Sequence, residues 1–297
     1  MKPLHAELLM VLVTVFWGSS YLFMAIGLDS IEVFNLIALR FGLGFIAGGL
    51  IFFRQLRKIS KITIRYALQL GFILFVVFTC ITIALHSTTT TNAGFLVSLT
   101  VVFVPLLNAF LFKNKINTKL TISIVLAIAG IALLTIQLPF HIAFGDLLCI
   151  IAALCYAIHI IVVGRATAME QINTLQLGIL QLGFAGLFGL LFSFIFETPL
   201  LPSTTKGWMA ILVLSIVCSA LGFTLQVIAQ KYISSARTGL IFSLEPVFVA
   251  LFGFFFAQET LSFKGYLGAF LVLFSIVISS SKQKNKIQLK EEFLSNS

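Results

Sequence analysis

The sequence predicts an all-α polytopic membrane protein, with ten transmembrane helices arranged as two inverted five-helix repeats around a central cavity. Three observations support this fold class: an apolar composition, ten apolar segments of membrane-spanning length, and an internal similarity between the two halves of the chain. Of the 297 residues, 60% are hydrophobic and only 10% are charged, and the mean hydropathy is +1.12. Soluble domains carry roughly 25% charged residues, so the chain is expected to lie in a membrane.

Ten apolar runs are long enough to cross a bilayer, which requires about 20 residues of helix. These runs are continuous rather than alternating, which argues against transmembrane strands. We expect the first run to be a retained helix, because no small-residue cleavage site follows it. The expected spans are 7–27, 33–53, 65–85, 93–112, 118–137, 145–164, 174–196, 207–230, 237–257 and 263–281.

The basic residues predict the orientation of these spans. With the N-terminus inside, the 19 Lys and Arg residues fall on the inner side, except for Lys206, Lys264 and the intramembrane Arg40. The positive-inside rule then places both termini in the cytoplasm. This topology accounts for the net charge of +9, so nucleic acid is not an expected partner. Short loops and tails favour a bacterial cytoplasmic (inner) membrane, and nothing in the sequence indicates the oligomeric state.

The two halves of the chain resemble each other. Sliding the chain by 145 residues lays Thr79–Phe110 on Thr224–Phe255 without a gap, and places Thr100 opposite Glu245. Identical pairs include Gly94 and Gly239, Ser98 and Ser243, and Val104 and Val249. Because each half holds five spans, the second half must enter the membrane from the opposite side, as in transporters with inverted repeats. We expect a first repeat at 1–138, a second at 139–281 and a flexible cytoplasmic tail at 282–297.

One carboxylate lies deep inside a predicted span, away from its ends. Glu245 stands beside Pro246, about 12 Å from the inner end of the ninth span at about 1.5 Å per residue. An acidic group at this depth is costly, and Pro246 weakens the helix there because it has no backbone N–H. Two interpretations stay open: a site for a coupling proton or a substrate ammonium group, and a structural acid bonded to backbone that Pro246 loosens.

Arg40 lies well inside a predicted span, away from both of its ends. It lies about 10 Å from the outer end of the second span, which leaves an axial gap of about 8 Å to Glu245 in a core about 30 Å thick. Recognition of a substrate carboxylate and pairing with Glu245 are both open. We favour instead snorkelling to the outer interface or a brace between helices.

Other polar and aromatic residues are candidates for lining a cavity. Polar side chains within spans usually face the bundle interior, and aromatic rings suit apolar or cationic substrates. Interhelical hydrogen bonds and ordinary packing are the alternative. Asp146 is expected to cap the sixth span. The candidates for substrate binding or coupling are Glu245, Arg40, Trp17, Tyr21, Tyr156, His159, Gln181, Gln226 and Gln230.

No pattern in the sequence predicts a catalytic centre, a cofactor or a metal site. The four cysteines lie in apolar spans without metal-like spacing, and we expect no disulfides. There is no nucleotide-binding loop, no HExxH or DDxxD-like motif, and no nucleophile–base pattern. A membrane-embedded enzyme and a non-transporting assembly or sensor protein are kept as alternatives to a transporter.

Several stretches resemble the EamA domains of the drug/metabolite transporter superfamily: Phe16–Ser20, Leu36–Phe41, the run from Ile83 to Pro105, Gly145–Leu148, and Leu244–Val247 continuing to Glu259. The resemblance covers nearly the whole chain and implies ten helices around a central cavity. It implies transport of a small metabolite, amino acid or drug-like solute. We therefore expect a secondary transporter, in the direction of export, that works by alternating access with protons as the candidate coupling ion. Pro105 and Pro246 are the candidate hinges.

Overall fold

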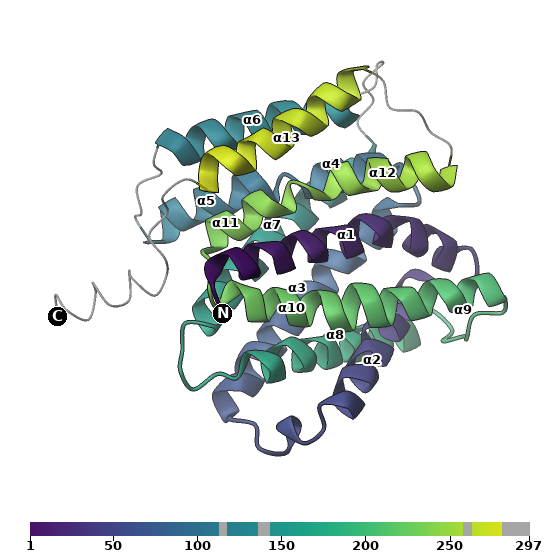
Figure 1. The fold of residues 1–297 in the computed structure, drawn as a ribbon. Coiled ribbons are helices and arrows are strands. Elements are labelled where there is room, and N and C mark those ends of the chain that lie inside the picture. Colours follow the sequence, from purple (N-terminus) through teal and green to yellow (C-terminus); the bar gives the residue numbers. More distant parts are fainter. Residues whose placement is uncertain (113–117, 136–142, 258–262, 281–297) are drawn as a thin grey trace.

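A computed structural model describes residues 1–112, 118–135, 143–257 and 263–280 (Figure 1). Within these ranges every regular element is a helix. Eight helical segments are long and apolar enough to cross a membrane, and two shorter apolar helices accompany them. The all-helical, polytopic class is thus confirmed for the described residues, whereas the inverted arrangement of ten helices stays a prediction. The predicted repeat boundary at 138 and 139, the tail at 282–297, and Glu259 lie outside the described residues.

The first half of the chain contains α1 (Pro3–Leu28), α2 (Val33–Ile51), the 3₁₀-helix η1 (Gln55–Arg57), α3 (Lys61–Ala84), α4 (Thr90–Val97), α5 (Thr100–Phe112) and α6 (Thr118–Thr135). Helices α1 and α3 begin four residues before the predicted spans, because their first turns carry polar or helix-starting residues that hydropathy does not count. Pro3 is tolerated in a first turn, where its missing N–H has no partner to lose. The hydroxyl of Ser60 caps α3 by accepting a hydrogen bond from Thr63 N at 3.2 Å.

The second half contains α7 (Phe144–Ala166), α8 (Thr174–Phe196), α9 (Thr205–Leu212), the π-helix η2 (Val213–Leu221), α10 (Gly222–Gln230), α11 (Ser235–Phe242), α12 (Glu245–Ala257) and α13 (Phe263–Ser280). The segments α9, η2 and α10 together form one span, Thr205–Gln230. As predicted, Asp146 caps α7: its carboxylate accepts a hydrogen bond from Ala143 N at 2.9 Å.

Helices at matching positions of the two halves pack against each other. Helix α2 lies along α8, and α6 lies along α13 (Figure 1). Helix α3 packs on α7 and α8, whereas α1 packs on α9, η2 and α10. The carboxylate of Glu197, at the end of α8, accepts hydrogen bonds at 2.8 Å from Phe34 N and Asn35 N in the first turn of α2. A negative charge is favourable at this helix N-terminus, so Glu197 fastens the two halves together at one end of the α2–α8 pair.

Two spans are interrupted at the same place in the internal alignment. Ser98 and Leu99 separate α4 from α5, and Ser243 and Leu244 separate α11 from α12. The amides of Leu99 and Leu244 each donate to the carbonyl three residues back, at 3.2 and 3.0 Å. Each break is therefore a tight turn of 3₁₀ type, which in mid-helix often marks a functional hinge. The second break falls immediately before Glu245, at the position where the sequence predicts a weakened helix.

The interrupted helices touch each other through equivalent residues. A Cβ atom built on Gly94 would lie 3.3 Å from Val249, and one built on Gly239 would lie 3.2 Å from Val104. In the internal alignment Gly94 matches Gly239 and Val104 matches Val249. The second contact is therefore the same as the first with the two halves interchanged. The interrupted helices thus pack around a local pseudo-twofold relation.

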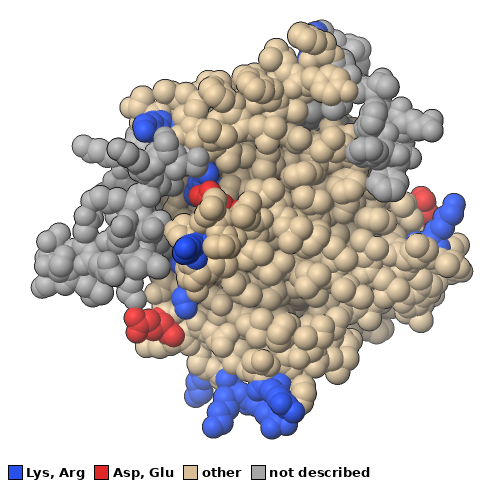
Figure 2. Space-filling model, viewed as in Figure 1, with Lys and Arg blue, Asp and Glu red and all other residues tan. Residues whose placement is uncertain are grey.

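The outer surface of the helical bundle is suited to lipid. Figure 2 shows the Lys and Arg side chains at the edges of this face and a broad uncharged area between them. Large apolar side chains are exposed along several helices, among them Leu50, Phe110, Phe194 and Phe270. Large exposed apolar side chains on so many helices are unusual for a soluble monomer. The described surface is consistent with an integral membrane protein.

Close approach between α2 and α8 depends on glycine. A Cβ atom added to Gly186 would lie 2.6 Å from the backbone nitrogen of Gly42, and one added to Gly189 would lie 2.7 Å from the nitrogen of Ala38. Both neighbours are backbone atoms, which cannot swing aside as a flexible side chain could. Glycine is therefore needed at positions 186 and 189 for the helices to meet at this distance.

We predict that Gly186→Ala destabilises the protein by about 1–3 kcal/mol, because the added methyl group forces the backbones of α2 and α8 apart. Gly42→Ala is the matched control, since a Cβ atom on Gly42 would have no heavy atom within 4 Å. The control should be neutral or stabilise by up to about 1 kcal/mol through the lower backbone entropy of alanine. Thermal unfolding in detergent measures both variants, and equal melting temperatures would contradict the packing described.

Candidate functional site

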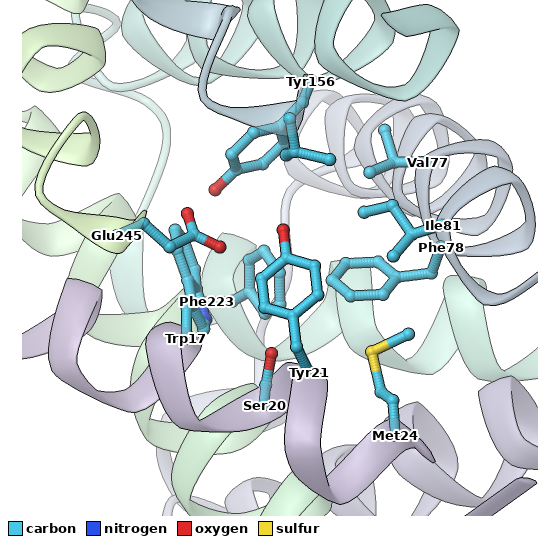
Figure 3. A pocket seen from close by; sticks show the side chains of 11 residues that line it. Trp17, Ser20, Tyr21, Met24, Val77, Phe78, Ile81, Tyr156, Phe223 and Glu245 are labelled. Carbon is cyan, nitrogen blue, oxygen red and sulfur yellow. The ribbon is translucent and has the colours of Figure 1, made fainter. Parts of the chain in front are cut away.

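A buried cavity lies between the two halves, beside the interrupted helices. Helix α1 contributes one face to it, α3 a second, and α7 and α10 complete the wall. The last residue of α4 and the first residue of α12 bring both helix breaks to the same cavity. Its lining, shown in Figure 3, consists of Trp17, Ser20, Tyr21, Met24, Val77, Phe78, Ile81, Val97, Tyr156, Phe223 and Glu245.

The polar centre of the cavity is formed by one carboxylate and two hydroxyl groups. In Figure 3 the Glu245 carboxylate and the hydroxyl groups of Tyr21 and Tyr156 point toward one another. The Tyr21 hydroxyl is the polar group of α1 that faces the Glu245 carboxylate. The Tyr156 hydroxyl is buried and has no hydrogen-bond partner among the described residues. A buried hydroxyl without a partner is costly, so the cavity offers an unmet polar group beside a carboxylate.

The space within the cavity is small. About 20 Å³ is open to a water-sized sphere, which is enough for one or two water molecules. Glu245 is only 6% exposed, and Tyr21 and Tyr156 are similarly buried. The structure therefore shows a closed arrangement, in which a solute larger than water requires the walls to separate.

Trp17 is fixed at the centre of an aromatic cluster. Its ring lies 4.8 Å from Phe223, 4.9 Å from Phe242 and 5.8 Å from Tyr156, measured between centroids. The indole Nε1–H donates to the carbonyl of Cys218 at 2.9 Å. Cys218 lies in the π-helix η2, a type of helix that is frequent at functional sites. The tryptophan thus joins α1 to the second half and presents an aromatic face to the cavity.

Arg40 is buried beside the cavity and does not reach the membrane interface. Its Nε donates to Ser219 Oγ at 3.0 Å and its Nη1 lies 3.1 Å from Met24 Sδ. The guanidinium carbon lies 4.2 Å from the centroid of Phe78, a cation–π contact. The snorkelling interpretation is wrong, because Arg40 is 0% exposed and faces other helices. The brace interpretation fits these contacts, which join α1, α2, α3 and η2.

No ion pair joins Arg40 to Glu245 within the described part of the chain. The two groups attract each other only at longer range, and the nearest partners of Arg40 are uncharged. The Nη2 atom of Arg40 is buried without a partner among the described residues. Met24 and Phe78, which the guanidinium contacts, line the described cavity, whereas Arg40 does not. Arg40 therefore lies next to the cavity wall rather than in it.

The remaining polar candidates bond to one another or to backbone and do not line the cavity. His159 Nε2 and Gln181 Oε1 are 3.0 Å apart. Gln226 donates to Gln230 at 2.9 Å, and Gln230 donates to the carbonyl of Ile160 at 3.0 Å. All four side chains are buried, and none of them lines the described cavity. The contacts favour interhelical hydrogen bonding for His159, Gln181 and Gln230, whereas Gln226 bonds within its own helix, α10. A role toward a substrate stays a prediction for all four.

The two candidate hinge prolines occupy different positions. Pro246 is the second residue of α12, where a missing N–H fits a helix start and leaves the carbonyl of Phe242 without its usual donor. Pro105 lies inside α5, after the first break. The two prolines are not equivalent in the internal alignment, so only the break itself is common to the two halves.

Sequence reasoning missed most of the apolar lining. Ser20 and Met24 could have been found, because they lie three and seven residues after Trp17 and share its helical face. Val77, Phe78 and Ile81 share one face of α3 but look like any other apolar residues in a span. Among the described residues, no group of three or more His, Cys, Asp or Glu side chains is placed to hold a metal.

These features define a class: an integral membrane protein with an enclosed polar and aromatic cavity between two halves of similar sequence. The model of the EamA-like transporter family matches residues 4–136 and 143–281. The chain therefore belongs to the EamA-like transporter family and is a membrane transporter in general terms.

Individual relatives agree with this assignment. The chain is 31% identical over 285 residues to a protein of Archaeoglobus fulgidus named as an uncharacterized transporter, covering 94% of this chain and 87% of the relative. It is 22% identical over 281 residues to the uncharacterized transporter YoaV of Bacillus subtilis, covering 90% and 94%. A protein of known crystal structure superposes with a TM-score of 0.79 at 18% identity, covering 94% and 97%, which shows the similarity of fold.

We predict that Tyr21→Phe destabilises the protein by about 1–3 kcal/mol, because it removes the hydroxyl group that faces a buried carboxylate. Tyr156→Phe is the matched control: it removes a hydroxyl of the same kind that has no partner among the described residues, and should be neutral or slightly stabilising. Melting temperatures in detergent compare the two. A larger loss for Tyr156→Phe would contradict the geometry.

Proposed function

We propose that this protein is a secondary transporter whose substrate is a small solute with an ammonium group and an apolar or aromatic body. The observation that carries the proposal is the Glu245 carboxylate, buried in an aromatic cavity at the break of a membrane helix. A carboxylate in this setting costs several kcal/mol unless a proton or a cation neutralises it. The aromatic rings of Trp17, Tyr156 and Phe223 suit a cation or an apolar body.

Alternating access is supported by the relation between the halves. The two breaks occupy equivalent positions, and α2 packs on its counterpart α8. The contact between Gly94 and Val249 also has an equivalent with the halves interchanged, between Gly239 and Val104. Inverted repeats that meet at a midplane site are the basis of rocking mechanisms in transporters. The closed cavity corresponds to a state between opening to one side and opening to the other.

Coupling follows from a single carboxylate that binds either a proton or the substrate ammonium group. Occupation by one excludes the other, so a proton moving down its gradient would drive the solute the opposite way. This exchange gives export when the gradient points into the cell, which is the direction we propose. No step requires a cofactor, because the driving force is the gradient.

We predict that Glu245→Gln abolishes proton-driven transport in liposomes, because an amide neither releases a proton nor attracts a cation. The assay applies a pH gradient and follows a panel of radiolabelled amines, amino acids and cationic drugs. Glu32→Gln is the control, since Glu32 is exposed at the start of α2. Unchanged pH dependence in Glu245→Gln would refute the coupling role, and no movement of any solute by the wild type would count against the substrate class.

We also predict that substrate binding changes the fluorescence of Trp17. The chain has two tryptophans, so in a Trp208→Phe background the emission comes from the buried Trp17 alone. Addition of a substrate identified in the liposome assay should shift or quench this emission in a saturable way. A Trp17→Phe variant that keeps Trp208 should show no such change, and a change in that variant would place binding elsewhere.

A further inference from the structure

The two interrupted spans begin in the same way, with a hydroxyl cap and a polar third residue. The hydroxyl of Thr89 accepts a hydrogen bond from Asn92 N at 3.1 Å, and the hydroxyl of Ser234 accepts one from Arg237 N at 3.2 Å. Asn92 and Arg237 are each the third residue of their helix, α4 and α11. They also fall on each other in the internal alignment, so Asn92 and Arg237 are counterparts in the two halves.

Asn92 contacts a carboxylate on the first helix of the other half. Its Nδ2 donates to Asp146 Oδ1 at 2.6 Å, and the hydroxyl of Thr88 donates to the same oxygen at 2.7 Å. Asn92 Nδ2 also donates to Thr88 Oγ1 at 2.8 Å. Asp146 lies in the first turn of α7 and is only 7% exposed. This three-residue cluster, the Asp146 latch, joins α4 of the first half to α7 of the second.

Arg237 makes the corresponding contact at the other interrupted span. Its Nε and Nη2 donate to the two carboxylate oxygens of Glu7 at 3.0 and 3.1 Å, a bidentate ion pair. Its Nη1 donates to the carbonyl of Ile276 at 2.8 Å. This cluster, the Glu7 latch, joins α11 of the second half to α1 of the first half and to α13.

The two latches lie at opposite ends of the bundle. Helix α11 packs on α5 and α12 packs on α4, so the interrupted spans run in opposite directions, and α4 and α11 begin at opposite ends (Figure 1). The cavity with Glu245 lies between these ends. In each latch, the third residue of an interrupted span contacts a carboxylate near the start of the first helix of the other half.

We infer that the Asp146 latch and the Glu7 latch are the two gates of the transport path. The inference rests on the alternating access proposed above. It specifies the contacts that must break for the cavity to open on each side. Both latches are formed in the structure, which agrees with a cavity that holds only one or two water molecules. Opening toward the end where α1 begins requires loss of the Glu7–Arg237 ion pair. Opening toward the other end requires loss of the hydrogen bonds that Thr88 and Asn92 donate to Asp146.

The gates differ in chemistry although they match in position. The Glu7 latch pairs opposite charges in bidentate geometry, which gives the stronger kind of hydrogen bond. The Asp146 latch pairs a carboxylate with uncharged donors. Loss of either latch should therefore shift the conformational equilibrium toward opening at its own end.

The test measures access to the cavity from each side of the membrane and requires no substrate. Val97→Cys places a thiol in the cavity lining, in a background where Cys80, Cys149, Cys155 and Cys218 are replaced by serine or alanine. A membrane-impermeant maleimide is applied to right-side-out and to inside-out vesicles. Arg237→Gln and Glu7→Gln should raise the ratio of labelling from the α1 side to labelling from the other side by about ten-fold, which corresponds to about 1.4 kcal/mol.

The opposite latch supplies the mirror-image variant. Asn92→Ala should change the labelling ratio in the other direction. Lys231→Gln is the charge control, because Lys231 is exposed at the end of α10 and belongs to neither latch; it should leave the ratio unchanged. Melting temperatures and elution profiles establish that each variant is folded.

A double-mutant cycle tests whether Glu7 and Arg237 act through their mutual ion pair or through two independent effects. Glu7→Gln combined with Arg237→Gln should change the ratio no more than either single variant, because the pair acts as a unit. Additive changes, or the same change from the Asn92 and Arg237 variants, would overturn the latch assignment. Labelling from the same single side in every variant, or from neither side in any variant, would instead overturn alternating access.

Discussion

A carboxylate in the interior of a membrane protein must find polar partners, and much of the site depends on how this chain supplies them to Glu245. Lipid offers no hydrogen bonds, so non-helical backbone is tolerated only where protein surrounds it. The span that carries the break, Ser235–Phe252, is accordingly the most buried of the described candidate spans, at 67%. Burial of this span places Glu245 against α1, where Tyr21 presents a hydroxyl group and Trp17 an aromatic ring.

The scaffold is nearly symmetric, whereas the chemistry on it is not. Thr100, the counterpart of Glu245, satisfies its own hydroxyl locally by donating to the carbonyl of Val97 at 2.6 Å. The first break therefore brings no charge to the cavity, while the second brings a carboxylate. The same difference occurs at the starts of the interrupted spans, where the uncharged Asn92 of the first half corresponds to the charged Arg237 of the second half. At these two pairs of equivalent positions, the first half carries an uncharged polar residue and the second half carries a charged one.

Much of this arrangement could be predicted from local sequence. Span positions follow from hydropathy, and the break follows from Glu245 and Pro246 together. The fate of Arg40 could not be predicted, because counting residues along a helix gives depth but not the direction of the side chain around the axis. The π-helix η2 also escaped prediction, since the hydrogen bond from Trp17 to the Cys218 carbonyl joins residues 201 positions apart.

The contacts between the halves are of two kinds, and they would respond differently to motion. Along α2 and α8 the backbones approach so closely at Gly186 that sliding would cost packing along the whole helix pair. At the ends of the interrupted spans, the contacts are a few directional hydrogen bonds that water can replace once exposed. A rocking motion would therefore lose the least free energy if it pivoted about the close contact between α2 and α8 and broke polar contacts at one end. Such a motion would widen the cavity around Glu245 while the helices themselves stay intact.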